Sequence, residues 1–217
     1  MQVSEAVVAR RSIRAYLDKP VSNETISTLL SKAARAPSGG NVQPWRIYVV
    51  NGDSMTRFME FVASQTERET PAYDIYPRDL QAPYRDSRFK VGEDMYKLLN
   101  IPREDKPARI RRLMENYRFF GAPAGIFCFI DRKMGPPQWS DLGMFLQTFM
   151  LLAQEEGLDT CAQEAWSARP DTVRNFVKAP QELTIFCGVA LGYGDPDVPV
   201  NSLVSEREAL HDFATFV

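Results

Sequence analysis

DLGMFLQTFMLLAQEE, residues 141–156, constrains the architecture more than any other stretch of this sequence. It predicts a helix that is apolar around most of its circumference, whereas a helix packed on one side needs only a single apolar stripe. Such a helix either runs through the centre of a domain or places its second face against another subunit. Residues 157–166, GLDTCAQEAW, follow it directly and carry the acid Glu164 in a nearly uncharged setting close to Trp166. A carboxylate in such surroundings is either part of a structural salt bridge or part of a site.

Three stretches predict strands of a sheet that packs with this helix. Residues 45–50, WRIYVV, predict a strand that ends at the turn pair Asn51-Gly52. Residues 124–130 and 183–191 are continuous apolar runs, which are typical of buried strands. Further helices are predicted at residues 5–10 (capped by Ser4), 22–36 (capped by Ser22 and ended by Pro37), 55–62 and 110–120. This order predicts a mixed β-sheet flanked by helices, in an α+β or α/β layered fold.

The length of 217 residues fits one domain, spanning residues 1–217. Residues 67–107 are its unusual part, because five prolines alternate there with aromatic residues. A loop this long within a compact domain is usually functional. We therefore expect an insertion that contains a helix near residues 89–99. Residues 198–217 are irregular and predict an extended arm that ends in a short helix.

Charge and hydropathy exclude two classes of function. The net charge of -2 and the pI near 5.6 argue against a general nucleic-acid binder. The basic residues between Arg109 and Arg118 are a local exception, and form either a solvated helix face or a nucleic-acid-binding helix. No stretch approaches the roughly 18 apolar residues of a membrane-spanning helix, and the N-terminus lacks the apolar core of a signal peptide. We therefore expect a cytoplasmic protein without nucleic-acid or membrane partners.

The cysteine and histidine content excludes several kinds of metal site and catalytic site. The three cysteines lie far apart without a CxxC pair, which predicts reduced and mostly buried thiols. His211 is the single histidine, so the sequence cannot build a multi-histidine zinc site or a Ser-His or Cys-His pair within a typical catalytic core. We expect no metal site, and a structural role for His211 near the C-terminus.

Three arginines and a hydroxyl group fall within residues 10–14, RRSIR. If the chain is extended here, Ser12 and Arg14 project to one side and Ile13 to the other. Arg10 and Arg14 would then close around one anion with the hydroxyl between them. Guanidinium groups suit phosphate because their planar fork donates two parallel hydrogen bonds. The alternative is a basic helix terminus that complements the helix dipole.

Residues 36–45, APSGGNVQPW, connect a predicted helix to a predicted strand. The glycines allow the backbone to approach a ligand closely, and the two prolines stiffen the frame. Ser38, Asn41 and Gln43 offer donors and acceptors that suit the edge of a flat heteroaromatic ring. The alternative is a polar connecting loop without a ligand.

In this order, the motifs resemble those of the FMN-dependent nitroreductase family. The resemblance covers residues 4–214 and is carried by RRSIRAY (10–16), APSGGNVQPWR (36–46), the apolar helix with the GLDTCAQEAW stretch, and ALGYGDPD (190–197). It implies a nitroreductase-like fold, in which two chains form an interlocked homodimer with exchanged C-terminal arms. It also implies that FMN binds at the subunit interface.

The resemblance implies that both ends of one chain hold the phosphate and ribityl part of FMN. Arg10, Ser12 and Arg14 would contact this part through their side chains, and Arg11 mainly through its backbone. Arg207 is the best match to the basic residue near the C-terminus that reaches the phosphate in this family.

The ring of FMN would lie against a second set of residues. The neighbouring subunit would contribute residues of its 36–45 loop, namely Pro37, Ser38, Gly39 and Asn41, with Gln43 near the flavin edge. Glu164 and the amide of Ala165 would lie by the reactive N5 region. Many relatives carry glycine in place of Ala165, and a left-handed backbone at an alanine would cost about 1 kcal/mol. The lysine that often contacts the pyrimidine edge has no assigned counterpart here.

The activity that the resemblance implies is the two-electron reduction of nitroaromatic, quinone or related acceptors by NADH or NADPH, in a ping-pong sequence. No protein nucleophile is expected, because the cofactor supplies the reactive atom. Within the 67–107 insertion, which we expect to form a substrate lid, Tyr84 and Arg85 are candidates for substrate binding. Arg85 would pair with a carboxylate on the acceptor, or it is an ordinary surface arginine.

Two other kinds of function remain open from the sequence. The same scaffold could carry another flavin reaction, such as reductive dehalogenation, enone reduction or oxidation of the bound flavin. A protein of a different class would bind flavin with low turnover. The sequence does not distinguish NADH from NADPH, nor does it identify the physiological acceptor.

Overall fold

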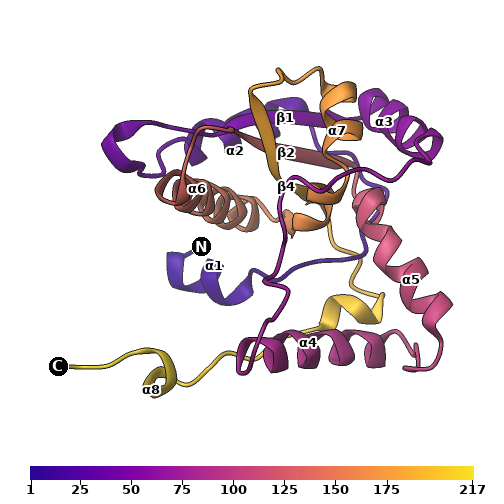
Figure 1. The fold of residues 1–217 in the computed structure, drawn as a ribbon, viewed down its shortest axis with the longest axis vertical. Helices are drawn as coiled ribbons and strands as arrows, with labels where there is room; N and C mark the ends of the chain where they lie inside the picture. The colour runs from indigo at the N-terminus through magenta and orange to yellow at the C-terminus, as the bar shows by residue number, and fades with distance from the viewer.

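The computed structural model describes all 217 residues, and a four-stranded sheet lies at its centre (Figure 1). The strands are β1 (Arg46–Asn51), β2 (Ala124–Asp131), β3 (Asp159–Gln163) and β4 (Leu183–Gly192). They lie in the order β1-β2-β4-β3, and every neighbouring pair is antiparallel. A parallel contact is added beside β3, where Ser12 bridges to Thr160. The sheet is therefore mixed only at the point where the N-terminal segment joins it.

Eight α-helices surround the sheet (Figure 1). They are α1 (Val3–Ala9), α2 (Asn23–Ala33), α3 (Asp53–Ser64), α4 (Tyr84–Leu98), α5 (Lys106–Met114), α6 (Pro136–Glu155), α7 (Pro170–Val177) and α8 (Leu210–Phe213). Helices α2 and α6 cover one face of the sheet, and α3 and α7 cover the other. None of these helices combines the length and the apolar character that a bilayer crossing requires.

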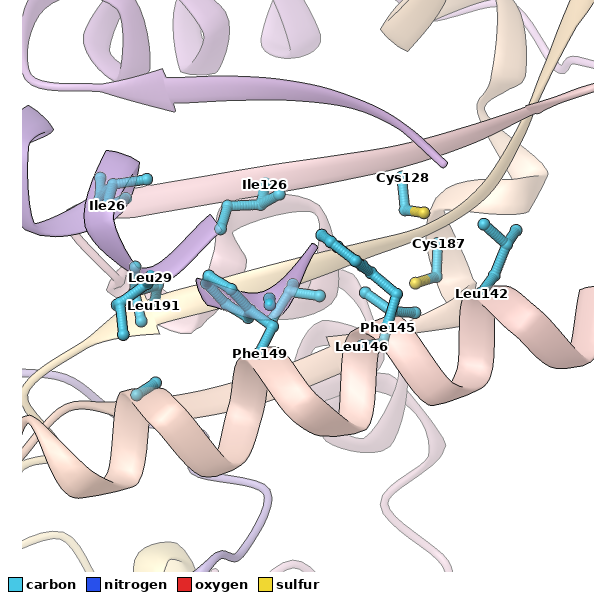
Figure 2. Packing of buried hydrophobic residues seen from close by; sticks show 14 of the residues in the cluster. Ile26, Leu29, Ile126, Cys128, Leu142, Phe145, Leu146, Phe149, Cys187 and Leu191 are labelled. Carbon is cyan, nitrogen blue, oxygen red and sulfur yellow. The ribbon is translucent and has the colours of Figure 1, made fainter. Parts of the chain in front are cut away.

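The first face of the sheet packs against α6. Figure 2 shows Leu142, Phe145, Leu146 and Phe149 of this helix directed at β2 and β4. The buried residues of α6 nevertheless form one face only, and Met144 on the opposite side is 38% exposed. The helix is therefore not enclosed by its own chain, although its sequence is apolar around most of its circumference.

The second face of the sheet is covered by aromatic rings. Gly125 and Gly188 allow this packing, because a Cβ atom would lie 2.5 Å from the Phe119 ring at Gly125 and 2.3 Å from the Trp166 ring at Gly188. Both rings are fully buried. They lie close to the strand backbone, which only glycine permits at these two positions.

The predicted helix boundaries hold best where a local cap fixes them. Ser22 accepts a hydrogen bond from the Thr25 amide at 3.0 Å and begins α2 as predicted. The predicted Ser4 cap is wrong, because α1 begins at Val3, two residues before the predicted start, and Gln2 takes the N-cap position. Glu5 accepts a hydrogen bond from the Gln2 amide at 2.8 Å and thereby fixes that start.

The single helix predicted at residues 110–120 is wrong in its second half. Helix α5 begins at Lys106 and is followed by a 3-10 segment, Glu115–Gly121. Phe119 and Phe120 adopt left-handed backbone conformations, with φ of 49° and 55°. Both side chains are buried, so packing of the rings overrides the helical pattern here.

Strand β3 and helix α7 were not predicted. Strand β3 has the sequence DTCAQ, in which three of five residues are polar, so it lacks the apolar run that marks β2 and β4. Its ladder with β4 supplies the pairing that the sequence alone does not reveal. Helix α7 has eight residues and begins at Pro170, which is short for recognition from periodicity.

The 67–107 segment and the C-terminal arm lie at the periphery of the molecule. Helix α4, within the segment, contributes no buried residue. The arm runs past α4 and away from the body (Figure 1). Its apolar side chains Val204, Leu210, Phe213 and Phe216 are all exposed.

Candidate functional site

The segment after α1 forms one wall of a cavity. Ile13 is 4% exposed, and its amide donates to the Thr160 carbonyl at 3.0 Å. This bond holds the segment extended beside β3, so that its neighbours Ser12 and Arg14 face the cavity. The predicted alternation is therefore confirmed. The cavity holds about 360 Å³ and also contains Arg10 and Arg11 in its lining.

The C-terminal arm forms the opposite wall, together with α4. Arg207 lines the cavity, and its guanidinium donates to the Ser205 hydroxyl at 2.7 Å. Lys90 of α4 lies 3.2 Å from the carboxylate of Glu206, which holds the arm beside the helix. Val91 of α4 completes this wall. The fold thus brings Arg207 to the RRSIR segment from the other end of the chain.

Positive charge in this cavity is not neutralised by the chain. Burial lowers the pKa of Arg10, and the nearby charge of Arg207 lowers this pKa further. No carboxylate side chain is among the residues that line the cavity. Two serines and four arginines therefore line a cavity in which a bound anion would be stabilised. Phosphate fits this donor set, because guanidinium groups bind it through paired, charge-assisted hydrogen bonds.

Hydrogen bonds made by Arg112 and Asn201 hold the cavity wall in place. Arg112 donates through Nη2 to the Arg14 carbonyl at 3.0 Å, and burial lowers the pKa of this guanidinium. Asn201 accepts from the Arg14 amide at 2.8 Å and donates to the Ala15 carbonyl at 2.8 Å. Sequence reasoning missed both positioning residues, since neither lies in a recognisable motif.

The loop between α2 and β1 has a shape that its own hydrogen bonds maintain. Asp141 is 4% exposed, and both of its carboxylate oxygens lie 3.3 Å from the Gly39 amide. Ser38 accepts from the Gln43 amide at 3.0 Å. Gly40 and Asn41 are left-handed, each with a φ of 57°. The loop is therefore prearranged, although Gly39 and the next residues face solvent.

The structure does not bring this loop to the arginine cavity. Pro37, Ser38, Gly39, Asn41 and Gln43 are absent from the cavity lining. The predicted site residues thus form two separate groups within one chain. Asp141, which supports the loop, was not predicted, although an acid at the start of an apolar helix is a visible signal.

Glu164 and Ala165 follow β3 and begin a 3-10 turn, Glu164–Ala168. Glu164 takes part in none of the ion pairs of the chain. This observation removes the salt-bridge interpretation of the acid. The side chain meets solvent on one side, yet burial of the remainder raises its pKa. Ala165 has no left-handed backbone, and its carbonyl accepts a hydrogen bond from the Tyr117 hydroxyl at 3.2 Å.

Tyr84 and Arg85 lie at the start of α4, outside the arginine cavity. Tyr84 is 68% exposed and lines a separate hollow of about 900 Å³ between α4 and the arm. The guanidinium of Arg85 lies 2.9 Å from the carboxylate of Asp86, and both side chains are exposed.

Comparison with known proteins identifies the family of this chain. Residues 7–193 match the sequence model of the nitroreductase family. The chain is 37% identical to 4-nitrobenzoate reductase of Pseudomonas putida, covering 98% of this chain and 95% of that protein. It is 34% identical to nitrobenzene nitroreductase of Ectopseudomonas oleovorans, covering 99% of this chain and 96% of that protein.

Solved structures give the same result. The fold is similar to that of the FMN and NADPH-dependent nitroreductase NfnB from Sphingopyxis sp. strain HMH, with a TM-score of 0.95 and 41% identity. The match covers 100% of this chain and 99% of that chain. From the family match and from relatives that share its full length, we conclude that this chain belongs to the nitroreductase family.

Proposed function

We propose that the protein binds FMN and uses NADH or NADPH to reduce nitroaromatic, quinone or related acceptors. The observation that carries this proposal is the cavity in which Arg10, Arg14 and Arg207 converge without a neutralising carboxylate. When bound, FMN would accept a hydride from the reduced nicotinamide and pass two electrons to the acceptor after the nicotinamide has left.

Each residue of the cavity has a defined task in this proposal. Arg10, Arg14 and Arg207 bind the phosphate of FMN through their guanidinium groups, and Ser12 adds a hydroxyl group. Arg11 contributes mainly through its backbone. Because Arg10 and Arg207 repel each other in the free chain, phosphate binding relieves this repulsion as well as forming new hydrogen bonds.

The ring of FMN requires a second copy of the chain. We propose that the neighbouring subunit supplies Pro37, Ser38, Gly39, Asn41 and Gln43, because this loop is prearranged but remote from the cavity of its own chain. The exposed apolar side chains of the arm would be covered in an interlocked homodimer. The uncovered side of α6 would also be buried there.

At the reactive edge of the ring, Glu164 and Ala165 act by position. The Ala165 amide donates a hydrogen bond towards the flavin, and its carbonyl is already held by Tyr117. The raised pKa of Glu164 limits negative charge beside the flavin at mildly acidic pH.

Residues 67–107 serve as the substrate lid in this proposal. Tyr84 and Arg85 are both exposed and would face the acceptor in the dimer, with Arg85 pairing to an acceptor carboxylate such as that of 4-nitrobenzoate. The three free, buried cysteines agree with a reducing compartment, and we place the protein in the cytoplasm.

The test begins with the absorbance spectrum of the purified protein, followed by release and identification of any bound flavin. The holoprotein is then mixed anaerobically with NADPH, and 4-nitrobenzoate is added. We expect bleaching of the yellow band within seconds and its recovery with the acceptor. A flavin that binds but does not bleach would identify a low-turnover flavin-binding protein. Colourless protein that refuses added FMN and sediments as a monomer would disprove the proposal.

A further inference from the structure

Tyr73 joins the 67–107 segment to the body of the protein. Its hydroxyl donates a hydrogen bond to the Phe186 carbonyl in β4. Its ring meets the Trp139 ring edge-on, with centroids 5.3 Å apart, and Trp139 in turn meets the Phe186 ring at 5.4 Å. Three aromatic residues from three different parts of the chain therefore form one contact.

The Phe186 carbonyl can accept this hydrogen bond because the sheet has a bulge at this position. Cys128 pairs with Cys187 and Phe129 pairs with Ile185, so that Phe186 has no partner in β2. A bulge leaves the extra residue outside the regular ladder. The Phe186 carbonyl is therefore available to a side chain, and the Tyr73 hydroxyl uses it.

The residues just before Tyr73 are also fixed, and they are fixed to the chain that follows Glu164. The Ala72 amide donates to the Ser167 carbonyl at 2.7 Å. Glu69 accepts from the Asp171 amide at 2.6 Å and from the Thr172 amide at 3.0 Å, at the start of α7. Beyond Tyr73 the situation changes, since residues 74–79 are exposed and α4 has no buried residue. Tyr73 is thus the last of these anchored positions in the proposed lid, and the exposed part of the lid follows it.

The surroundings keep the Tyr73 hydroxyl protonated and hence able to donate. Burial raises the pKa of Tyr73 well above its usual range, and the nearby carboxylate of Glu164 raises it further. The anchor also lies beside the turn that Glu164 begins, because the Ala72 amide donates to the Ser167 carbonyl within that turn.

We infer that Tyr73 is a positioning residue, which holds the 74–85 segment at a fixed place relative to Glu164 and so determines how tightly the acceptor is bound. The inference rests on the proposed function, because it concerns the acceptor of that reaction. The inference concerns a different part of the molecule from the phosphate cavity, since Tyr73 would act on the lid.

The test is Tyr73→Phe, with Tyr48→Phe as the matched control. Tyr48 lies on β1, where its ring packs edge-on against Phe129. Amide hydrogen exchange in the flavin-free protein is expected to be about 5- to 10-fold faster across residues 74–98 of Tyr73→Phe, the effect of one lost hydrogen bond. The KM for 4-nitrobenzoate should rise by about the same factor, while kcat and the Kd for FMN change by less than about 2-fold.

Glu69→Gln separates anchoring from general stability. It weakens the contact with α7 but leaves the Tyr73 hydrogen bond intact, so it should lower the melting temperature without raising the KM for 4-nitrobenzoate. Unchanged exchange and unchanged KM in Tyr73→Phe would overturn the inference. So would a parallel change of KM, kcat and FMN affinity, which indicates a purely structural role. If the wild-type protein binds no FMN, the proposed function fails, while an unchanged exchange pattern would still refute the anchor independently.

Discussion

The arginine cavity and the loop at residues 37–43 are opposite kinds of half-site. Side chains from both ends of one chain build the cavity, and their positive charges repel each other when no anion is bound. Backbone shape builds the loop, which Asp141 and Ser38 hold in place while its outer residues face solvent. The cavity is complete within one chain, but its positive charges have no negative partner. The loop is held by hydrogen bonds within the chain, but its outer residues face only solvent.

This difference indicates how a binding site can be divided between two copies of a chain. Phosphate binding demands charge, which one chain gathers from its two ends. Ring binding demands a rigid edge, which a neighbour can supply if its loop is already formed. Four changes test this division, beginning with the one that should have the largest effect.

Removal of residues 204–217 should abolish both halves of the site. It deletes Arg207 together with the exposed apolar residues of the arm, so that neither the phosphate contact nor the dimer is maintained. We expect a monomer in analytical ultracentrifugation and no retained FMN. Arg207→Ala is the control, which should weaken FMN binding but leave the dimer intact. A truncated chain that remains dimeric would place the interface elsewhere.

Arg10→Ala should weaken FMN binding by about 10- to 100-fold, the range expected for hydrogen bonds to a charged group. Its effect on the flavin-free protein should be small, because the change also removes the repulsion between Arg10 and Arg207. Fluorescence titration gives the Kd, and urea unfolding gives the stability. Arg57→Ala, at an exposed position on α3, should change neither quantity. Equal affinities in the two variants would exclude the cavity as the phosphate site.

Asp141→Asn should disturb the loop and leave the cavity unaltered. The carboxylate accepts from the Gly39 amide while buried, and its loss should lower the free energy of unfolding by about 1 kcal/mol. We expect a decrease of FMN affinity by about 3- to 10-fold, with no change in binding of inorganic phosphate, as measured by calorimetry. Asp79→Asn, in an exposed stretch, serves as the control. Weakened phosphate binding would mean that the two half-sites are not independent.

Glu164→Gln should have the smallest effect, visible mainly in its pH dependence. Because the folded-state pKa of Glu164 is raised, its contribution to stability is present below the unfolded-state pKa and is lost as the pH rises through the folded-state pKa. The variant should therefore gain stability relative to wild type as the pH increases from about 4, and the gain should then level off. Urea unfolding at a series of pH values measures this difference. A difference that is constant with pH would contradict the raised pKa.

Local signals in the sequence predicted those parts of the molecule that local chemistry determines. Ser22 caps its helix, and the alternation after Arg11 places Ile13 in the core and Arg14 in the cavity. Buried strands β2 and β4 were visible as apolar runs. The prediction failed where distant contacts decide the conformation, as in β3, which depends on its ladder with β4, and at Phe119 and Phe120, whose rings pack below the sheet.

The same distinction applies to the candidate site. The RRSIR segment, the loop and the acid Glu164 were recognisable in the sequence, and the resemblance to the family added Arg207 and the role of Glu164. Asn201, Asp141 and Tyr73 were missed, because each acts on a partner more than 100 residues away in the sequence. Their importance comes from tertiary contacts that no spacing rule describes.

Helix α4 makes the entrance of the proposed site tolerant of change. None of its fifteen residues belongs to the buried core, so substitutions along it remove little packing and leave folding largely intact. New acceptor preferences can therefore arise here by single substitutions, except at Lys90 and Val91, which belong to the wall of the arginine cavity. A mutant library over residues 84–98 that retains Lys90 and Val91 is the economical starting point for redirecting this scaffold to other acceptors.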